Sequence, residues 1–164
     1  MPTSRGLVNA LEAGLMQAFT RVFGEALVSL VLYGSYARGD FDKESDVDVL
    51  VVLESISDRY ALQSMLDRVE EELKPLFKCL NQYGYSPAIS PIALSREEAR
   101  VTRPLYLDIV FDAKVLYDKD GFMASVLEKV RRKLSEYGAE RVKIGSKWVT
   151  VLKKNYRFGE VIEF

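Results

Sequence analysis

The sequence contains no histidine among its 164 residues. Without an imidazole, the chain has no Ser-His-Asp or Cys-His nucleophile, no His-ligated zinc and no histidine proton shuttle. The single cysteine, Cys79, excludes an internal disulfide and a Cys-based zinc site, and we expect it to be buried as a small hydrophobe. The chemistry that remains depends on carboxylates, lysine, tyrosine and metal ions.

Long apolar runs are also absent. No stretch approaches the roughly 18 apolar residues of a membrane-spanning helix, so we expect no association with a membrane. The first residues include Arg5 but no continuous apolar segment, which predicts no signal peptide and a cytoplasmic location. The formal net charge of −1 argues against a protein that coats nucleic acid through bulk charge. A chain of 164 residues is most simply one domain.

The charges are distributed unevenly along the chain. Seven acidic residues lie between Asp40 and Asp58, which is typical of a metal site. Ten basic residues against three acidic ones lie between Glu128 and Arg157, with Trp148 among them. This basic segment could bind a nucleic-acid backbone or an acidic partner, or it could be a solvated helix face and hairpin. Nucleic acid therefore stays open as a partner.

Apolar periodicity predicts a small mixed sheet flanked by helices, an α+β fold. Helices are predicted over residues 7–23, 58–77 and 121–137, and strands over 27–33, 47–53, 88–94 and 115–117. Pro91 favours an edge position for the third of these strands. The segment 104–111 is ambiguous between strand and helix, residues 141–152 predict a β-hairpin, and the alternation near the end of 156–164 indicates a further strand. We expect a core over 1–120 and a C-terminal helix-plus-hairpin extension of the same domain over 121–164.

Two short motifs stand at the ends of the first two predicted strands. Gly34-Ser35 follows one apolar run, and Asp46-Val47-Asp48 opens the next after a gap of ten residues. A strand that ends in Gly-Ser can offer backbone amides and a hydroxyl to a phosphate. Strand side chains repeat every two residues, so Asp46 and Asp48 point to the same face. Paired carboxylates suit Mg²⁺ bound together with substrate phosphates. The two motifs predict nucleoside triphosphate chemistry.

This segment resembles the signature of the DNA polymerase beta nucleotidyltransferase superfamily, in particular its minimal nucleotidyltransferase branch. The Gly-Ser, ten-residue, Asp-x-Asp spacing matches without a gap error, and Arg38 within Ala37-Arg38-Gly39 matches as well. The resemblance implies the nucleotidyltransferase fold and a Mg²⁺-dependent enzyme of the EC 2.7.7 type. ATP or another NTP is then the substrate, and an acceptor hydroxyl receives NMP.

The resemblance assigns roles to five residues. Asp46 and Asp48 are the catalytic carboxylates and the metal ligands that it implies. Gly34 would allow the backbone to approach the triphosphate, and Ser35 would donate to a terminal phosphate. Arg38 either contacts phosphate or braces the loop by pairing with a neighbouring aspartate.

One departure from the family pattern concerns a third carboxylate. Many members carry it on a later strand, often as the general base toward the acceptor. The corresponding strand here is 88–94, which offers Ser90 and no acid. Asp108 or Asp112 could supply the missing group; otherwise the site has two carboxylates and a weaker base, which would slow attack by the acceptor.

Two functional hypotheses follow. The first is a nucleotidyltransferase that moves NMP, AMP above all, to a hydroxyl, because the minimal branch is associated with antitoxins that adenylylate a partner toxin; small molecules and RNA ends are other acceptors. The second is a catalytically weak nucleotide-binding or antitoxin-type interaction module with the same fold. A domain of this size has little surface to enclose an acceptor, so we expect a homodimer or a partner to complete the cleft.

Overall fold

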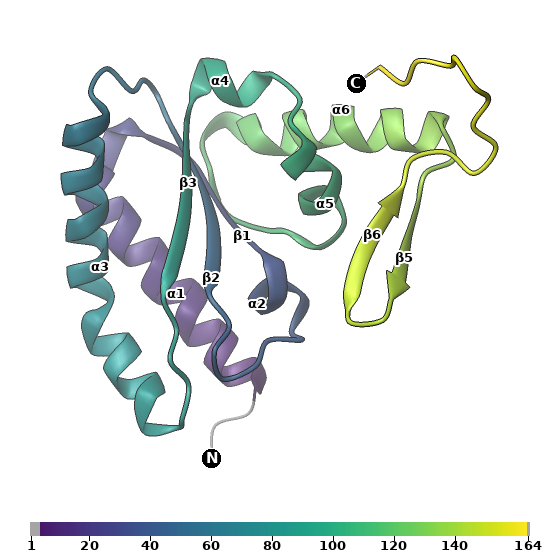
Figure 1. The fold of residues 1–164 in the computed structure, drawn as a ribbon. Coiled ribbons are helices and arrows are strands. Elements are labelled where there is room, and N and C mark those ends of the chain that lie inside the picture. The colour runs from purple at the N-terminus through teal and green to yellow at the C-terminus, as the bar shows by residue number, and fades with distance from the viewer. Residues whose placement is uncertain (1–3, 164) are drawn as a thin grey trace.

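The computed structural model describes residues 4–163 and contains a four-stranded mixed sheet with the strand order β3-β2-β1-β4 (Figure 1). Strand β1 pairs antiparallel with both β2 and β4, and β2 pairs parallel with β3. The strands are β1 Leu27–Tyr33, β2 Val47–Leu53, β3 Ile89–Ser95 and β4 Lys114–Asp118. The predicted mixed sheet is confirmed. Strand β3 lies at its edge and has one neighbouring strand, so no second strand needs the backbone N–H that Pro91 lacks.

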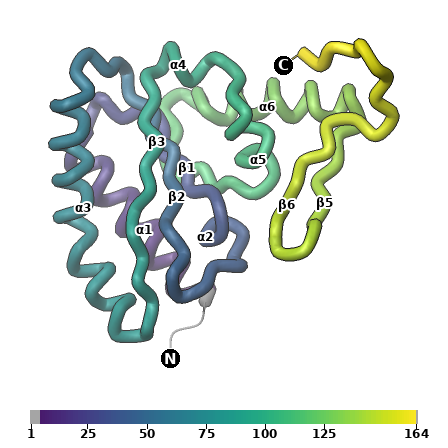
Figure 2. The backbone as a smooth tube through the Cα atoms, in the orientation of Figure 1, coloured from purple at the N-terminus to yellow at the C-terminus, as the bar shows by residue number. Residues whose placement is uncertain are grey.

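Helices cover both faces of this sheet (Figures 1 and 2). The longer ones are α1 Ser4–Phe23, α3 Arg59–Gln82, α5 Pro104–Asp112 and α6 Phe122–Glu136. The shorter ones are η1 Gly24–Ala26, α2 Gly34–Arg38, α4 Arg96–Arg100 and η2 Lys119–Gly121. No helix within residues 4–163 is long and apolar enough to cross a membrane.

The sheet separates two apolar cores. Helices α1 and α3 pack on one face, through residues such as Leu11, Phe19 and Val69. Helices α4, α5 and α6 pack on the other face, through residues such as Tyr106 and Leu127. Both faces of β1 are buried, which explains why its sequence is an almost continuous apolar run rather than an alternating one.

The alternation of β2 decides where its carboxylate points. Val47, Val49 and Val51 face the core of α1 and α3. Leu50 and Val52 face the opposite core, and Asp48 shares their parity, so its side chain lies on the α5 and α6 side of the sheet. The Asp48 carboxylate therefore lies at the N-terminal end of β2, beyond the apolar residues that cover this face of the sheet.

The segment that was ambiguous between strand and helix is helix α5. Pro104 stands in its first turn, where a missing N–H costs nothing, and Tyr106, Ile109 and Val110 form a buried stripe with helical spacing. The capping box that begins α4 joins Ser95 and Glu98, each side chain bonding the other's backbone N–H.

Two expectations about single segments are wrong. Cys79 is exposed rather than buried, because the buried stripe of α3 runs through Leu73 and Leu80 and leaves Cys79 one position away from it. Residues 156–163 form turns and irregular structure rather than a strand, and the segment buries no apolar face, since Tyr156, Phe158 and Val161 are exposed; Phe164 lies outside the described residues.

The C-terminal hairpin forms a separate two-stranded sheet of β5 Glu140–Ile144 and β6 Lys147–Val151, joined at Gly145-Ser146. It stands beside α2 and α5, away from the four-stranded sheet (Figure 2). Helix α6 contributes Met123 and Val130 to the core beneath β1. The division at residue 121 stays a prediction.

Candidate active site

The first predicted motif lies where β1 passes into α2. Tyr33 ends the strand in extended backbone, and Gly34 begins the helix with a φ of 71°, in the left-handed region that glycine tolerates. Gly34 also lies against the next strand, because a Cβ at this position would be 2.1 Å from Oδ2 of Asp48. The Gly-Ser and Asp-x-Asp motifs are therefore in direct contact.

The two aspartates of the second motif differ in exposure. Asp46 precedes β2 and is exposed, whereas Asp48 is half-buried as the second residue of the strand. Burial raises the pKa of Asp48, the negative charge of Asp46 raises it further, and the charge of Arg38 opposes the shift. The negative charges of these two carboxylates are chemically suited to a bound cation.

The loop between the motifs is held by its own side chains. The Asp42 carboxylate accepts hydrogen bonds from the Ser45 hydroxyl and the Glu44 amide, at 2.9 and 3.0 Å. Arg38 Nε donates to both oxygens of Asp40, at 3.1 and 3.2 Å. The bracing role expected for Arg38 is thus present, while its guanidinium also lines the cavity described below.

The two tyrosines that flank Gly34-Ser35, Tyr33 and Tyr36, have different surroundings. Tyr36 is buried and stacks on Phe41, with ring centroids 4.3 Å apart. Tyr33 lines the cavity, and burial together with the charge of Asp48 raises its pKa to about 12. Tyr36 therefore acts in packing, and Tyr33 stays protonated next to the carboxylate.

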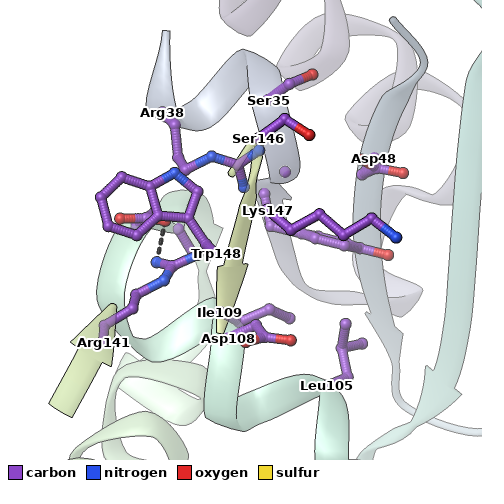
Figure 3. Close-up of a pocket in the computed structure, with 14 residues that line it drawn as sticks. Ser35, Arg38, Asp48, Leu105, Asp108, Ile109, Arg141, Ser146, Lys147 and Trp148 are labelled. Atoms are coloured by element: carbon purple, nitrogen blue, oxygen red, sulfur yellow. Dashed lines mark hydrogen bonds and ion pairs between the residues drawn. The ribbon is translucent and has the colours of Figure 1, made fainter. Parts of the chain in front are cut away.

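A cavity of about 450 Å³ opens at the junction of the two motifs (Figure 3). This volume is within the range of small-molecule sites. One wall comes from β1, α2 and β2, a second from α5, and a third from the β5–β6 hairpin. The lining residues are Tyr33, Gly34, Ser35, Arg38, Asp48, Leu105, Asp108, Ile109, Asp112, Ala113, Arg141, Ser146, Lys147 and Trp148.

The strand on which the resemblance places a third carboxylate is β3, and it offers Ser90 there instead of an acid. In the parallel pairing of β2 with β3, Ser90 is the direct partner of Asp48, and the burial of Leu94 on the α5 and α6 side gives it the same face. Asp108 and Asp112 line the opposite wall on α5. Asp112 pairs with Arg141, and Asp108 accepts from Thr150 at 3.3 Å. Within residues 4–163, no three carboxylates come together as a metal site.

Residues from the hairpin were not assigned to this site from the sequence. Lys147 and Trp148 are recognisable there only as part of a basic and aromatic segment. Nothing in the sequence marks the apolar residues Leu105 and Ile109 as lining a site, because even the secondary structure of the α5 segment is ambiguous in the sequence. Contacts between elements that are distant in the chain were needed to bring these side chains to Asp48.

The donor set fits a hard divalent cation. Asp46 and Asp48 offer carboxylate oxygens, which Mg²⁺ combines with phosphate oxygens of a substrate. Because Gly34 has no Cβ, the Asp48 carboxylate can lie directly beside Gly34-Ser35. Because two carboxylates leave most coordination positions to other oxygens, such a cation would be held jointly with a phosphorylated ligand.

Comparison with known proteins agrees with this geometry. The family model described as "Nucleotidyltransferase domain" matches residues 16–137. The Methanocaldococcus jannaschii protein named "Putative protein adenylyltransferase MJ1305" is 30% identical over 127 residues, which cover 76% of this chain and 82% of the relative. The chain belongs to the nucleotidyltransferase domain family, and it is a nucleotidyltransferase.

Two further similarities extend over part of the chain. "Putative protein adenylyltransferase MJ0141" from the same organism is 34% identical over 73 residues, which cover 43% of this chain and 63% of the relative. A solved variant of the toxin–antitoxin complex MntA–HpeT superposes with a TM-score of 0.50 at 15% identity, over 77% of this chain and 92% of the matched chain. At this identity the superposition supports the nucleotidyltransferase fold.

Proposed function

We propose that this protein transfers AMP from Mg²⁺-bound ATP to a hydroxyl group of a partner protein. The observation that carries the proposal is the contact between the two motifs, where Gly34 lies against the carboxylate of Asp48 at the mouth of one cavity. A protein as acceptor is supported by the name of the relative MJ1305. The proposal that this acceptor is a toxin is supported by the solved toxin–antitoxin complex, in which the matched chain has the same fold.

The reaction forms one bond and breaks another. The acceptor oxygen attacks the α-phosphorus of ATP, the bond from that phosphorus to the oxygen bridging the β-phosphate breaks, and pyrophosphate leaves. The proton of the hydroxyl passes to a base, and negative charge accumulates on the phosphate oxygens. The barrier is therefore lowered by positioning and by positive charge around the triphosphate.

Each motif residue has a part in this scheme. Asp46 and Asp48 would hold Mg²⁺, which when bound supplies Lewis-acid stabilisation of the triphosphate. Gly34 admits the phosphates close to the backbone, and Ser35 donates its hydroxyl to them. Arg38, with its Nε engaged by Asp40, has further guanidinium N–H groups for a phosphate oxygen.

The acceptor side of the site is open in a single copy of the chain. Asp48 is only half-buried, and the cavity is lined by polar groups from several elements. We propose that the acceptor protein itself covers the α-phosphate, which would exclude water from the reacting atoms. A second copy of the chain could take the same place, and size measurement in the presence of the acceptor separates the two.

The test is a titration followed by a transfer assay. Calorimetry should show ATP binding that requires Mg²⁺ and is lost in Asp48→Ala, with the far-UV spectrum of the variant unchanged. Incubation of wild type with α-labelled ATP and cell lysate should then place label on a protein. Binding without transfer to any molecule would support the interaction module instead, and absence of binding would overturn the site.

A further inference from the structure

The β5–β6 hairpin is attached to the side of the cavity that α5 provides. Arg141 forms an ion pair with Asp112, and its side chain is only 10% exposed. Its guanidinium lies between the rings of Phe111 and Trp148, at 5.5 and 5.2 Å from their centroids. Thr150 also donates to Asp108 on α5. These contacts fix the strands of the hairpin against the helix.

The same hairpin also approaches the loop after α2 on the other side of the cavity. Trp148 lies close enough to Asp40 to lower the pKa of its carboxyl, and Arg38 Nε donates to the same carboxylate at 3.1 Å. Burial opposes ionisation of Asp40, but the hydrogen bond from Arg38, the Trp148 indole and the nearby charge of Lys143 hold the pKa of this carboxyl below its usual value. The hairpin therefore spans the cavity from α5 to the loop after α2.

The side chain of Lys147 differs from those of the neighbouring lysines in its interactions. Lys154 pairs with Glu140, Lys153 with Glu160, and Lys143 lies 5.6 Å from the ring centroid of Trp148. The ammonium group of Lys147 makes no hydrogen bond or ion pair within the described part of the chain, although the backbone of Lys147 pairs with Ile144 in the hairpin. Figure 3 shows its side chain running from the hairpin across the cavity toward the strand of Asp48. An unpaired ammonium group held opposite a phosphate loop is suited to a polyphosphate.

We propose that Lys147 binds the β- and γ-phosphates of the nucleotide from the side opposite Ser35, and that Arg141 and Trp148 are positioning residues that hold the hairpin over the site. This inference rests on the proposed function and extends it to a segment outside the signature motifs. A nucleoside triphosphate would then be distinguished from a monophosphate by the hairpin, while Gly34 and Asp48 contact both.

The test compares ATP with AMP on matched variants by calorimetry in the presence of Mg²⁺. Lys147→Met should weaken ATP binding about 10-fold or more, as expected for loss of a charge-assisted hydrogen bond, and leave AMP binding within about twofold. Lys147→Arg should recover most of the ATP affinity. Lys154→Met carries the same change in charge at an exposed ion pair outside the cavity and should alter neither affinity.

The positioning role is tested by a double-mutant cycle. Asp112→Asn removes the ion pair with Arg141 and should also weaken the binding of ATP more than the binding of AMP. The double variant Asp112→Asn/Lys147→Met should bind ATP no more weakly than Lys147→Met alone. Additive losses would overturn the positioning role, because the ion pair would then act independently of Lys147.

Two other outcomes are informative. Equal losses for ATP and AMP in Lys147→Met, or no loss for either, with normal binding by wild type, would overturn the role of Lys147 and leave the proposed function intact. Failure of wild type to bind ATP at all would overturn the proposed function together with this inference.

Discussion

A Cβ atom on Gly34 would lie 2.1 Å from Oδ2 of Asp48 and 3.1 Å from its Cγ. Gly34 begins helix α2 and Asp48 lies in strand β2, so the two residues belong to different motifs and different elements, and the absence of a Cβ at position 34 makes room for the Asp48 carboxylate. Any larger residue at position 34 must rotate Asp48 away from the position in which it faces the cavity. Glycine at position 34 is therefore required for the observed placement of the Asp48 carboxylate.

Gly34→Ala is therefore expected to weaken Mg²⁺-dependent ATP binding by about 10-fold or more. The left-handed φ of 71° adds a stability cost of about 1–2 kcal/mol. Gly39→Ala is the matched control, since Gly39 has a φ of 83° but a Cβ there meets no atom within 4 Å. Chemical denaturation should give similar losses for both variants, and calorimetry should separate them. Equal ATP affinity in the two would contradict the contact argument.

Asp48→Asn should stabilise the protein in the absence of metal while it removes Mg²⁺-dependent ATP binding. Burial and the charge of Asp46 raise the pKa of Asp48, so the ionised form is disfavoured in the folded state. Wild-type stability from this group is greatest below the pKa of the unfolded state and is lost as the pH rises through the folded pKa. At neutral pH the substitution should raise Tm by about 1–3 °C, a small effect because solvent screens a half-buried group.

Asp108→Asn provides the comparison for that experiment. Asp108 lines the same cavity, but it lies on α5 and makes no three-carboxylate group with Asp46 and Asp48 in the described part of the chain. Its substitution should leave Mg²⁺-dependent ATP binding within about twofold. Loss of binding comparable with Asp48→Asn would show instead that Asp108 is a metal ligand.

Ser90→Asp should increase the rate of nucleotidyl transfer. Ser90 pairs with Asp48 across the parallel strands and faces the same side of the sheet, so an aspartate there would stand beside the existing carboxylates. A general base contributes about 10²–10⁴-fold in typical cases, and we expect at least a tenfold gain in the single-turnover rate. Ile92→Asp, two residues along the same face and 39% exposed, adds the same charge farther from the site and should give no gain. An unchanged rate in Ser90→Asp would indicate that the site does not lack a base.

Two buried tyrosines should respond differently to loss of their hydroxyl groups. The Tyr36 hydroxyl is buried without a hydrogen-bond partner among the described residues, so Tyr36→Phe should be neutral or stabilising by up to about 1 kcal/mol. The Tyr106 hydroxyl donates to the Ala99 carbonyl at 2.8 Å, so Tyr106→Phe should cost about 1–2 kcal/mol. Urea denaturation of both variants measures the difference, and a destabilised Tyr36→Phe would reveal a partner for that hydroxyl.

Local patterns in the sequence were enough to predict the four strands of the main sheet and to single out the two motifs. Residues 27–33 and 47–53 are almost continuous apolar runs of seven residues rich in valine and leucine, which is typical of a buried strand, and the structure has strands there. The spacing of Gly34, Ser35, Asp46 and Asp48 is local information, because a strand end and a period of two already fix which side chains can converge. Family membership followed from the same short segment, and the match over residues 16–137 agrees with it.

The surroundings of those motifs depend on contacts between elements that are distant in the chain. Segment 104–112 is apolar on most sides, and its identity as a helix depends on packing against β1 and α6 rather than on periodicity. The Arg141–Asp112 ion pair joins residues 29 positions apart and brings Lys147 to the cavity. Ser90 pairs with Asp48 across two parallel strands that helix α3 separates in the chain. Such contacts arise from the way elements bury their apolar faces together, and no local pattern in the chain encodes them.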